Sequence, residues 1–185
     1  MTARLKNALG WVLLVVGLSL AWYGLSSAND FVFQQLSLTP NATLIYLPAA
    51  LRIIYPLVFR SAGVWAIIIG GYFVVQDRVN DGTIDIISLA VMSGVAPLIG
   101  IGLFKMLFTT KPALAELKTV HFFGLGSLCA ASNAVLLNLY FAMTGRLMQP
   151  IKHAMTIFIG DVGGTVIVLS ILSFVLTFFI SRRRV

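Results

Sequence analysis

The stretch LIYLPAALRIIYPLVF, residues 44–59, places an arginine in the middle of an apolar run. Arg52 has one proline four residues before it, Pro48, and another four residues after it, Pro56. A charge at the centre of a membrane helix costs from about 3 kcal/mol on insertion scales to more than about 10 kcal/mol on an isolated helix. We therefore expect Arg52 to be paired, solvated in a cavity, or used in function.

One face of this stretch is the best candidate for the wall of a polar cavity. Pro48, Arg52 and Pro56 share a helix face because they are spaced by four residues. Each proline leaves a backbone carbonyl group without its usual helical partner, and such groups need other donors inside a membrane. Tyr46, just before this face, joins Pro48 and Arg52 as a candidate ligand-contacting residue.

Composition places the chain in a membrane. Of its 185 residues, 59% are hydrophobic and 10% are charged, whereas a soluble domain is about 25% charged. The apolar runs leave no room for a separate soluble domain, so residues 1–185 are predicted to form a single transmembrane domain. The net charge of +7 does not indicate a nucleic-acid partner, because lysine and arginine cluster at the ends of apolar runs.

Six apolar runs predict an all-α integral membrane protein, a bundle of about six transmembrane helices. The runs are 8–25, 42–59, 64–75, 84–108, 121–143 and 150–180. The run 64–75 is short for a span, so we expect it to be tilted or only partly inserted.

The first run has two interpretations. It follows Arg4 and Lys6 and ends at small residues near Ser27, as a cleaved signal peptide would. An uncleaved helix is favoured because glycines recur every seven residues, which gives the small-residue stripe of a packed membrane helix. The glycines are Gly10, Gly17 and Gly24.

Basic residues orient the six predicted helices, because cytoplasmic loops carry an excess of lysine and arginine. One side receives Arg4, Lys6, Arg60, Lys105, Lys111, Lys118 and Arg182 to Arg184. The other side receives Asp30, Asp77, Arg78, Asp81, Arg146 and Lys152. The pattern predicts a multi-pass membrane protein with both termini in the cytoplasm.

Asp161 is the expected partner of Arg52. At a rise of about 1.5 Å per residue, Arg52 lies roughly 16 Å in from Asn41 and Asp161 roughly 12 Å in from His153, both counted from the outer side. An acid and a base at matching depth on different helices predict a direct or water-bridged pair. The pair has two interpretations, a structural pair that fixes helix register and a ligand or proton site.

Small and amide residues surround Asp161 in the predicted bundle. Gly160 and Gly164 form a G-x-x-x-G pattern, which lets another backbone approach closely. Asn133 and Asn138 fall in the outward half of the fifth predicted helix, where amides either bond across helices or line a cavity.

No catalytic group, metal site or cofactor is expected. His121 and His153 begin helices on opposite sides, and the single Cys129 supports neither a disulfide nor a metal motif. No serine or cysteine nucleophile has a suitable base. Aromatic residues that suit the membrane interface are Trp11, Trp22, Tyr23 and Tyr72.

Two stretches carry a resemblance to a known family. Residues 42–72 contain an aromatic-Leu-Pro-Ala block, Tyr46 to Ala49, then a short basic turn, Arg60 to Trp65, then Gly70-Gly71. Residues 158–164 read FIGDVGG. In order and spacing these blocks resemble the opening block and last helix of the bacterial membrane-associated sensor domains of the MASE group, type one.

The chain also departs from that family. The family usually has glycine where Ala50 stands, more helices than six, and a proline after the final Gly-Asp block. Its members are commonly fused to histidine kinase or cyclic-di-GMP domains, and this chain ends at arginines without one. The resemblance implies a sensory or scaffolding module of the bacterial inner (cytoplasmic) membrane that acts through a separate partner.

Three functions fit these observations. The first is a stand-alone membrane sensor or interaction subunit. The second is a substrate-binding transport subunit resembling the S-components of energy-coupling-factor transporters, although the first helix carries glycines instead of their alanine-rich motif. The third is a structural or assembly subunit of a larger complex. Expected partners are the lipid bilayer and a membrane or signalling protein or a second copy of the chain, but not nucleic acid. An enzyme is not expected.

Overall fold

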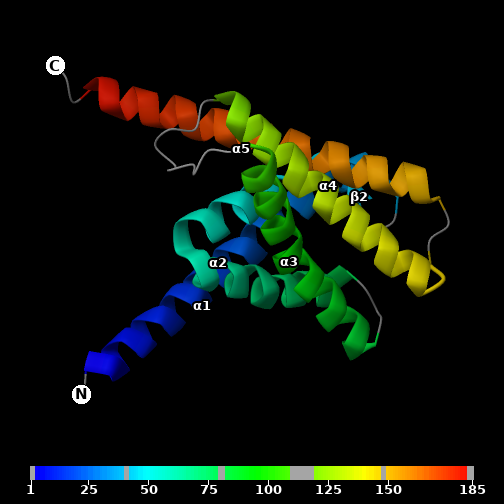
Figure 1. Ribbon diagram of the computed structural model, residues 1–185, viewed down its shortest axis with the longest axis horizontal. Coiled ribbons are helices and arrows are strands. Elements are labelled where there is room, and N and C mark those ends of the chain that lie inside the picture. Colours follow the sequence, from blue (N-terminus) through cyan, green and yellow to red (C-terminus); the bar gives the residue numbers. More distant parts are fainter. Residues whose placement is uncertain (1–2, 40–41, 79–81, 109–118, 147–148, 183–185) are drawn as a thin grey trace.

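The computed structural model describes residues 3–39, 42–78, 82–108, 119–146 and 149–182. Its helices are α1 (Ala3–Phe33), α2 (Ala49–Arg78), α3 (Thr83–Leu107), α4 (Thr119–Met143) and α5 (Pro150–Arg182). A short 3-10 helix, η1 (Gln34–Leu36), and two antiparallel strands, β1 (Ser37–Thr39) and β2 (Ala42–Thr43), connect α1 to α2. The helices form one bundle of strongly tilted elements (Figure 1).

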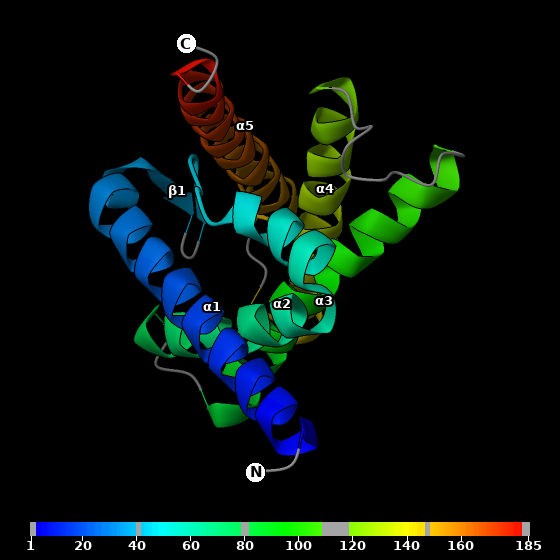
Figure 2. The ribbon, with the colours of Figure 1, turned by 90° about the vertical axis from the view of Figure 1, so that its left-hand side faces the viewer.

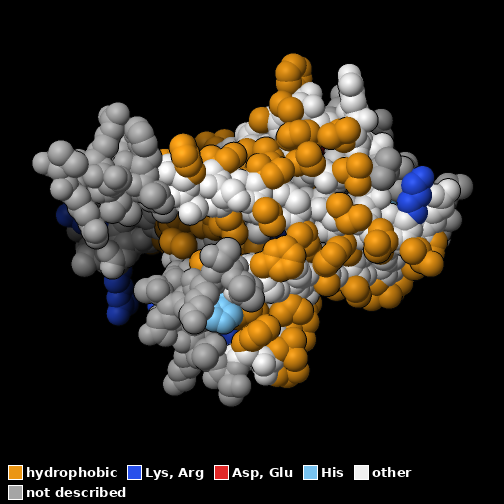
Figure 3. Space-filling model, turned by 90° about the horizontal axis from the view of Figure 1, so that it is seen from above, with side chains coloured by type: hydrophobic (Ala, Val, Ile, Leu, Met, Phe, Trp, Pro, Cys, Tyr) orange, Lys and Arg blue, Asp and Glu red, His pale blue; other side chains and the backbone are white. Residues whose placement is uncertain are grey.

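The fold is that of a multi-pass helical membrane protein. Five helices in the described residues are long and apolar enough to cross a membrane, and a helix suits the bilayer because it satisfies its own backbone groups. Large apolar side chains cover the outside of the bundle, among them Leu20 (65% exposed), Val135 (65%) and Phe174 (74%). Figure 3 shows hydrophobic side chains across the face that it presents, with no acidic side chain visible.

The second helix, α2, reverses direction at Arg60. Arg60 has φ 52° and ψ −127°, a conformation that residues other than glycine rarely adopt. Gly63 then lies so close to Tyr55 that a Cβ on Gly63 would overlap the Tyr55 carbonyl group. In a straight helix, residues eight positions apart are separated by about 12 Å. The two halves of α2, 49–59 and 61–78, therefore form a helical hairpin, and its bend is visible in Figures 1 and 2.

This hairpin explains why the described residues contain five such helices and not the predicted six. The second and third predicted runs both lie within α2, joined at Arg60 without a loop. The turn expected after residue 59 is present, but it is a bend at one residue with positive φ, so the two runs form one continuous element instead of two separate helices. The second run also becomes helical only at Ala49.

The second half of α2 runs parallel to α1. Gly70 packs against Ser19, and further along both helices Arg78 pairs with Asp30. In Figure 1 the start of α1 and the end of α5 both lie at the left. Some charges used above to orient the helices lie outside the described residues; these are Asp81, Lys111, Lys118, Arg183 and Arg184.

The last three helices pack as antiparallel neighbours. Asp85, at the start of α3, accepts a hydrogen bond from Tyr140 near the end of α4. Asn138, also near the end of α4, contacts His153 at the start of α5. The start of α3 and the start of α5 therefore both lie beside the end of α4.

A segment without regular helix, residues 43–47, lies against α5 at Gly160 and Gly164. A Cβ on Gly160 would overlap the Thr43 carbonyl oxygen, and one on Gly164 would overlap the Tyr46 carbonyl group. The Tyr46 amide donates a hydrogen bond to the Gly160 carbonyl oxygen at 3.0 Å. The backbone that packs against Gly160 and Gly164 is thus the irregular segment 43–47 and not another helix. Figure 2 shows this connection passing between α1 and α5.

Candidate functional site

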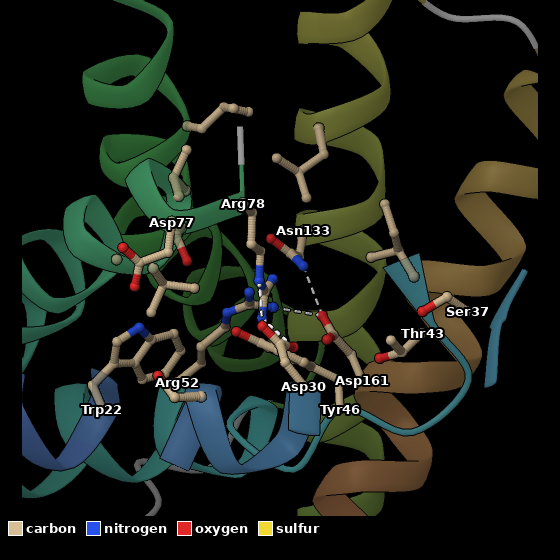
Figure 4. Close-up of a pocket in the computed structure, with 18 of the residues that line it drawn as sticks. Trp22, Asp30, Ser37, Thr43, Tyr46, Arg52, Asp77, Arg78, Asn133 and Asp161 are labelled. Carbon is tan, nitrogen blue, oxygen red and sulfur yellow. Dashed lines mark hydrogen bonds and ion pairs between the residues drawn. The ribbon is translucent and has the colours of Figure 1, made fainter. Parts of the chain in front are cut away.

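A polar cavity of about 620 Å³ lies among the helices. All five helices contribute to its wall, together with β1, β2 and Tyr46. Its inner end is formed by buried side chains, whereas its outer end reaches exposed residues at the ends of α1 and α2. Its charged and amide lining residues, labelled in Figure 4, are Asp30, Arg52, Asp77, Arg78, Asn133 and Asp161.

A buried ion pair forms the inner end of this cavity. Arg52 Nη1 donates to Asp161 Oδ2 at 2.7 Å, and the same oxygen accepts from Asn133 Nδ2 at 2.7 Å. The three residues are 8%, 5% and 2% exposed, in the order Arg52, Asp161 and Asn133. The cluster ties α2 to α5 and α4. Of the two arrangements expected from matching depth, direct or water-bridged, the structure shows the direct one.

Two aromatic rings hold the Arg52 guanidinium group. Its central carbon lies 5.6 Å from the centroid of Trp22 and 5.0 Å from that of Tyr46, within the range of cation–π attraction. Three atoms in this region have no hydrogen-bond partner among the described residues: Arg52 Nε, Trp22 Nε1 and Asn133 Oδ1. Each buried polar group of this kind costs about 1–3 kcal/mol unless something binds it.

A second ion pair stands at the outer end. Arg78 donates from Nε to Asp30 Oδ2 at 2.7 Å and from Nη2 to Asp30 Oδ1 at 2.6 Å. The two side chains are 27% and 37% exposed. The Arg78 guanidinium carbon lies 5.7 Å from the Tyr46 ring centroid. Because the Tyr46 ring contacts both arginines, it links the outer pair to the inner one.

Asp77 is the third acidic residue of the lining. Its Oδ2 accepts a hydrogen bond from the Tyr23 hydroxyl at 2.7 Å. No cation in the described part of the chain lies within ion-pair distance of Asp77. On the α5 side the cavity is lined by His153, whose Nδ1 is 3.3 Å from Asn138 Oδ1.

The structure brings four of the predicted site residues together at the cavity: Tyr46, Arg52, Asn133 and Asp161. The other two predicted residues do not line it. Pro48 is buried just before α2, where its carbonyl accepts from the Arg52 amide at 3.3 Å. Asn138 donates to the Ala134 carbonyl at 2.8 Å and contacts His153.

The lining residues that sequence reasoning missed include Trp22, Asp30, Asp77 and Arg78. Trp22 resembles an interface anchor in the sequence, but it is 1% exposed and packs in the core. Asp30, Asp77 and Arg78 read as ordinary loop charges. Only the reversal of α2 brings Arg78 beside Asp30, and the turn expected near Arg60 did not show which side chains would then meet.

The predicted packing glycines behave in two ways. Gly160 and Gly164 lie against the segment 43–47. Gly10, Gly17 and Gly24 have no described atom within 4 Å of an added Cβ. Packing through the Gly10–Gly17–Gly24 stripe stays a prediction, and it concerns a contact outside this bundle.

The site offers hydrogen bonds and charge. In the parts of the chain that are described, no three His, Cys, Asp or Glu side chains are grouped to hold a metal ion. The arrangement is therefore suited to binding a small polar molecule in apolar surroundings. Comparison with protein-family models, curated proteins and solved structures finds no match to this chain.

Proposed function

We propose that the protein is a membrane sensor or interaction subunit that binds a small polar molecule in the cavity and acts through a separate partner protein. One observation carries the proposal: the buried Arg52–Asp161 pair faces a cavity lined by every helix. An intramembrane charge pair is costly and marks a functional site by default. The unpartnered Arg52 Nε supports binding over a purely structural pair, which would use its donors internally.

The pair also offers a route from binding to response. Arg52 belongs to the first half of α2 and Asp161 to α5, and the two helices are joined there by one hydrogen bond of 2.7 Å. A ligand that binds better when this bond is broken or reoriented shifts the protein toward a different placement of α2. A partner in contact with α2 or α5 would detect that shift.

The resemblance to the membrane-associated sensor domains adds support of a different kind. The two stretches that carry it, 42–72 and 158–164, touch each other at the cavity. Thr43 and Tyr46 of the first stretch pack on Gly160 and Gly164 of the second. Membership of that family is part of the proposal.

The proposal includes the topology. Because α2 folds back on itself, the chain makes six passes. Four are made by α1, α3, α4 and α5, one by the second half of α2, and one by the segment 43–47 together with the first half of α2, which alone is too short to span. Both termini then lie on the cytoplasmic side of a bacterial inner membrane, together with the Arg60 bend. Reporter fusions at the two ends test this; reporters on opposite sides of the membrane would refute six passes.

Access to the cavity tests ligand binding directly. Both variants are made in a Cys129→Ala background. Ser93→Cys places a thiol in the cavity lining. Val91→Cys places a thiol on the surface of the same helix that faces away from the bundle, where Val91 is 40% exposed. We expect a charged, membrane-impermeant methanethiosulfonate reagent to modify position 93 from the non-cytoplasmic side and to leave position 91 unmodified. Failure to modify position 93 would refute a binding site open to that side.

A transport subunit is the second candidate, because a cavity lined by every helix would also serve substrate capture. Mass spectrometry of the protein taken from its native membrane in mild detergent separates the two. A kinase or cyclase at near-equal stoichiometry supports sensing. An ATP-binding module, or a tightly held metabolite, supports transport. A fixed place in a large complex with the cavity inaccessible would refute both and favour an assembly role.

A further inference from the structure

The two ends of the cavity differ in how their polar groups are buried and paired. At the inner end, Arg52 Nε and Trp22 Nε1 are N–H donors with no hydrogen-bond partner among the described residues. The adjacent guanidinium group is fixed by Asp161 on one side and by the Trp22 and Tyr46 rings on the other. Donors held in this way suit an acceptor oxygen of a ligand.

The charges of the lining decide what else that ligand carries. Arg52 is balanced by Asp161, and Arg78 is balanced by Asp30 through two hydrogen bonds. The lining therefore has two arginines and three aspartates, and the excess negative charge is that of Asp77. A ligand that brought only an anion would add to this excess negative charge. A ligand that brought only a cation would leave the inner N–H donors without an acceptor.

We infer that the cavity binds a small dipolar molecule, with a carboxylate or similar acceptor at Arg52 and Trp22 and an ammonium group toward Asp77. The inference rests on the proposed function, because it names the ligand class of the same site. Figure 4 shows Trp22, Arg52 and Asp77 around the same space, with the Arg78–Asp30 pair beside them. Opposite charges on one small molecule would meet both needs of the lining and leave its charge balance unchanged.

The chain contains its own reporter for this test. Its three tryptophans are Trp11, Trp22 and Trp65; Trp22 lines the cavity, whereas Trp11 and Trp65 are 43% and 51% exposed. In a Trp11→Phe/Trp65→Phe variant, tryptophan fluorescence reports on Trp22 alone. The probes are 4-aminobutanoate and 6-aminohexanoate, compared with butanoate and butylamine.

We expect a saturable change in Trp22 fluorescence with at least one of the dipolar probes. We expect at least tenfold weaker binding of butanoate and butylamine. Asp77→Asn should remove the advantage of the dipolar probe over butanoate by at least tenfold, since it removes the excess negative charge. Asp85→Asn, which removes an acidic charge at a position that does not line the cavity, is the matched control and should leave that ratio within about twofold.

Three outcomes overturn the inference. One is equal binding of butanoate and the dipolar probes by the unmodified site, and another is an unchanged ratio in Asp77→Asn. The third is no response to any probe while a thiol at position 93 is modified from the outer side; the ligand class is then wrong and the proposed binding function stands. If position 93 is not modified either, both the ligand class and the binding function are refuted.

Discussion

Replacing Gly164 with alanine tests whether the segment 43–47 is seated on α5 as described. The new Cβ would overlap the Tyr46 carbonyl group and lie 2.8 Å from the Leu47 nitrogen. Favourable contacts between heavy atoms need about 3.5–4.0 Å, so the segment would have to move by more than about 1 Å. Gly163 is the matched control, because a Cβ there meets only the Leu44 carbonyl oxygen, at 3.8 Å.

The expected magnitudes follow from opposing terms. Alanine is better than glycine inside a helix by about 1 kcal/mol, and both substitutions gain this. Overpacking at Gly164 costs about 1–3 kcal/mol or more. Moving the segment also strains the 2.9 Å hydrogen bond from the Leu47 amide to Asn29 Oδ1, which contributes about 1 kcal/mol. We expect Gly164→Ala to lower the free energy of unfolding by about 1–3 kcal/mol, and Gly163→Ala to raise it by up to about 1 kcal/mol.

Titration with a denaturing detergent in mixed micelles, followed by circular dichroism, measures both variants against the parent. Gly160→Ala should behave like Gly164→Ala, because its Cβ would overlap the Thr43 carbonyl oxygen. Equal shifts of the same sign for Gly163→Ala and Gly164→Ala would show that no backbone lies against Gly164, and the reasoning would be refuted.

Three further predictions use the same titration. Removing the charge of Arg52 or Asp161 alone should cost about 3–5 kcal/mol, and the pair Arg52→Met/Asp161→Leu should cost less than the sum; strictly additive losses would contradict a coupled pair. Arg78→Gln or Asp30→Asn should change stability by only about 0–1 kcal/mol, since that pair is partly exposed; a loss above about 3 kcal/mol would mean that it is buried. Arg60→Gly should stabilise by about 1 kcal/mol or more, because glycine adopts φ near 52° without strain; an equal gain in Arg60→Ala would argue against a strained bend.

Much of the helical structure could be predicted from apolar runs. The described bounds of α3 and α4 lie within two residues of the runs 84–108 and 121–143. The first helix extends past its apolar run of 8–25 to Phe33, because its later polar residues find partners inside the protein. Asn29, for example, accepts a hydrogen bond from the Leu47 amide.

The Arg52–Asp161 pair could also be predicted from the sequence. Depth along a helix follows from counting residues, so Arg52 and Asp161 could be matched before any contact was known. The angle around a helix axis could not be counted in the same way. The positions of Asp30, Asp77 and Arg78 at the outer end of the cavity depend on the reversal of α2. That reversal depends on the backbone conformation of Arg60.

The seat of the segment 43–47 on α5 has a consequence for biogenesis. Arg52 and Asp161 are 109 positions apart, and the Tyr46 amide likewise waits for the Gly160 carbonyl near the end of the chain. When α2 has just been synthesised, α5 has not, so the Arg52 charge and the Tyr46 backbone amide still lack their partners on α5. Such groups are poorly tolerated in lipid. The first half of α2 must remain near water or a helper protein during synthesis and take its final place only after α5 has been inserted.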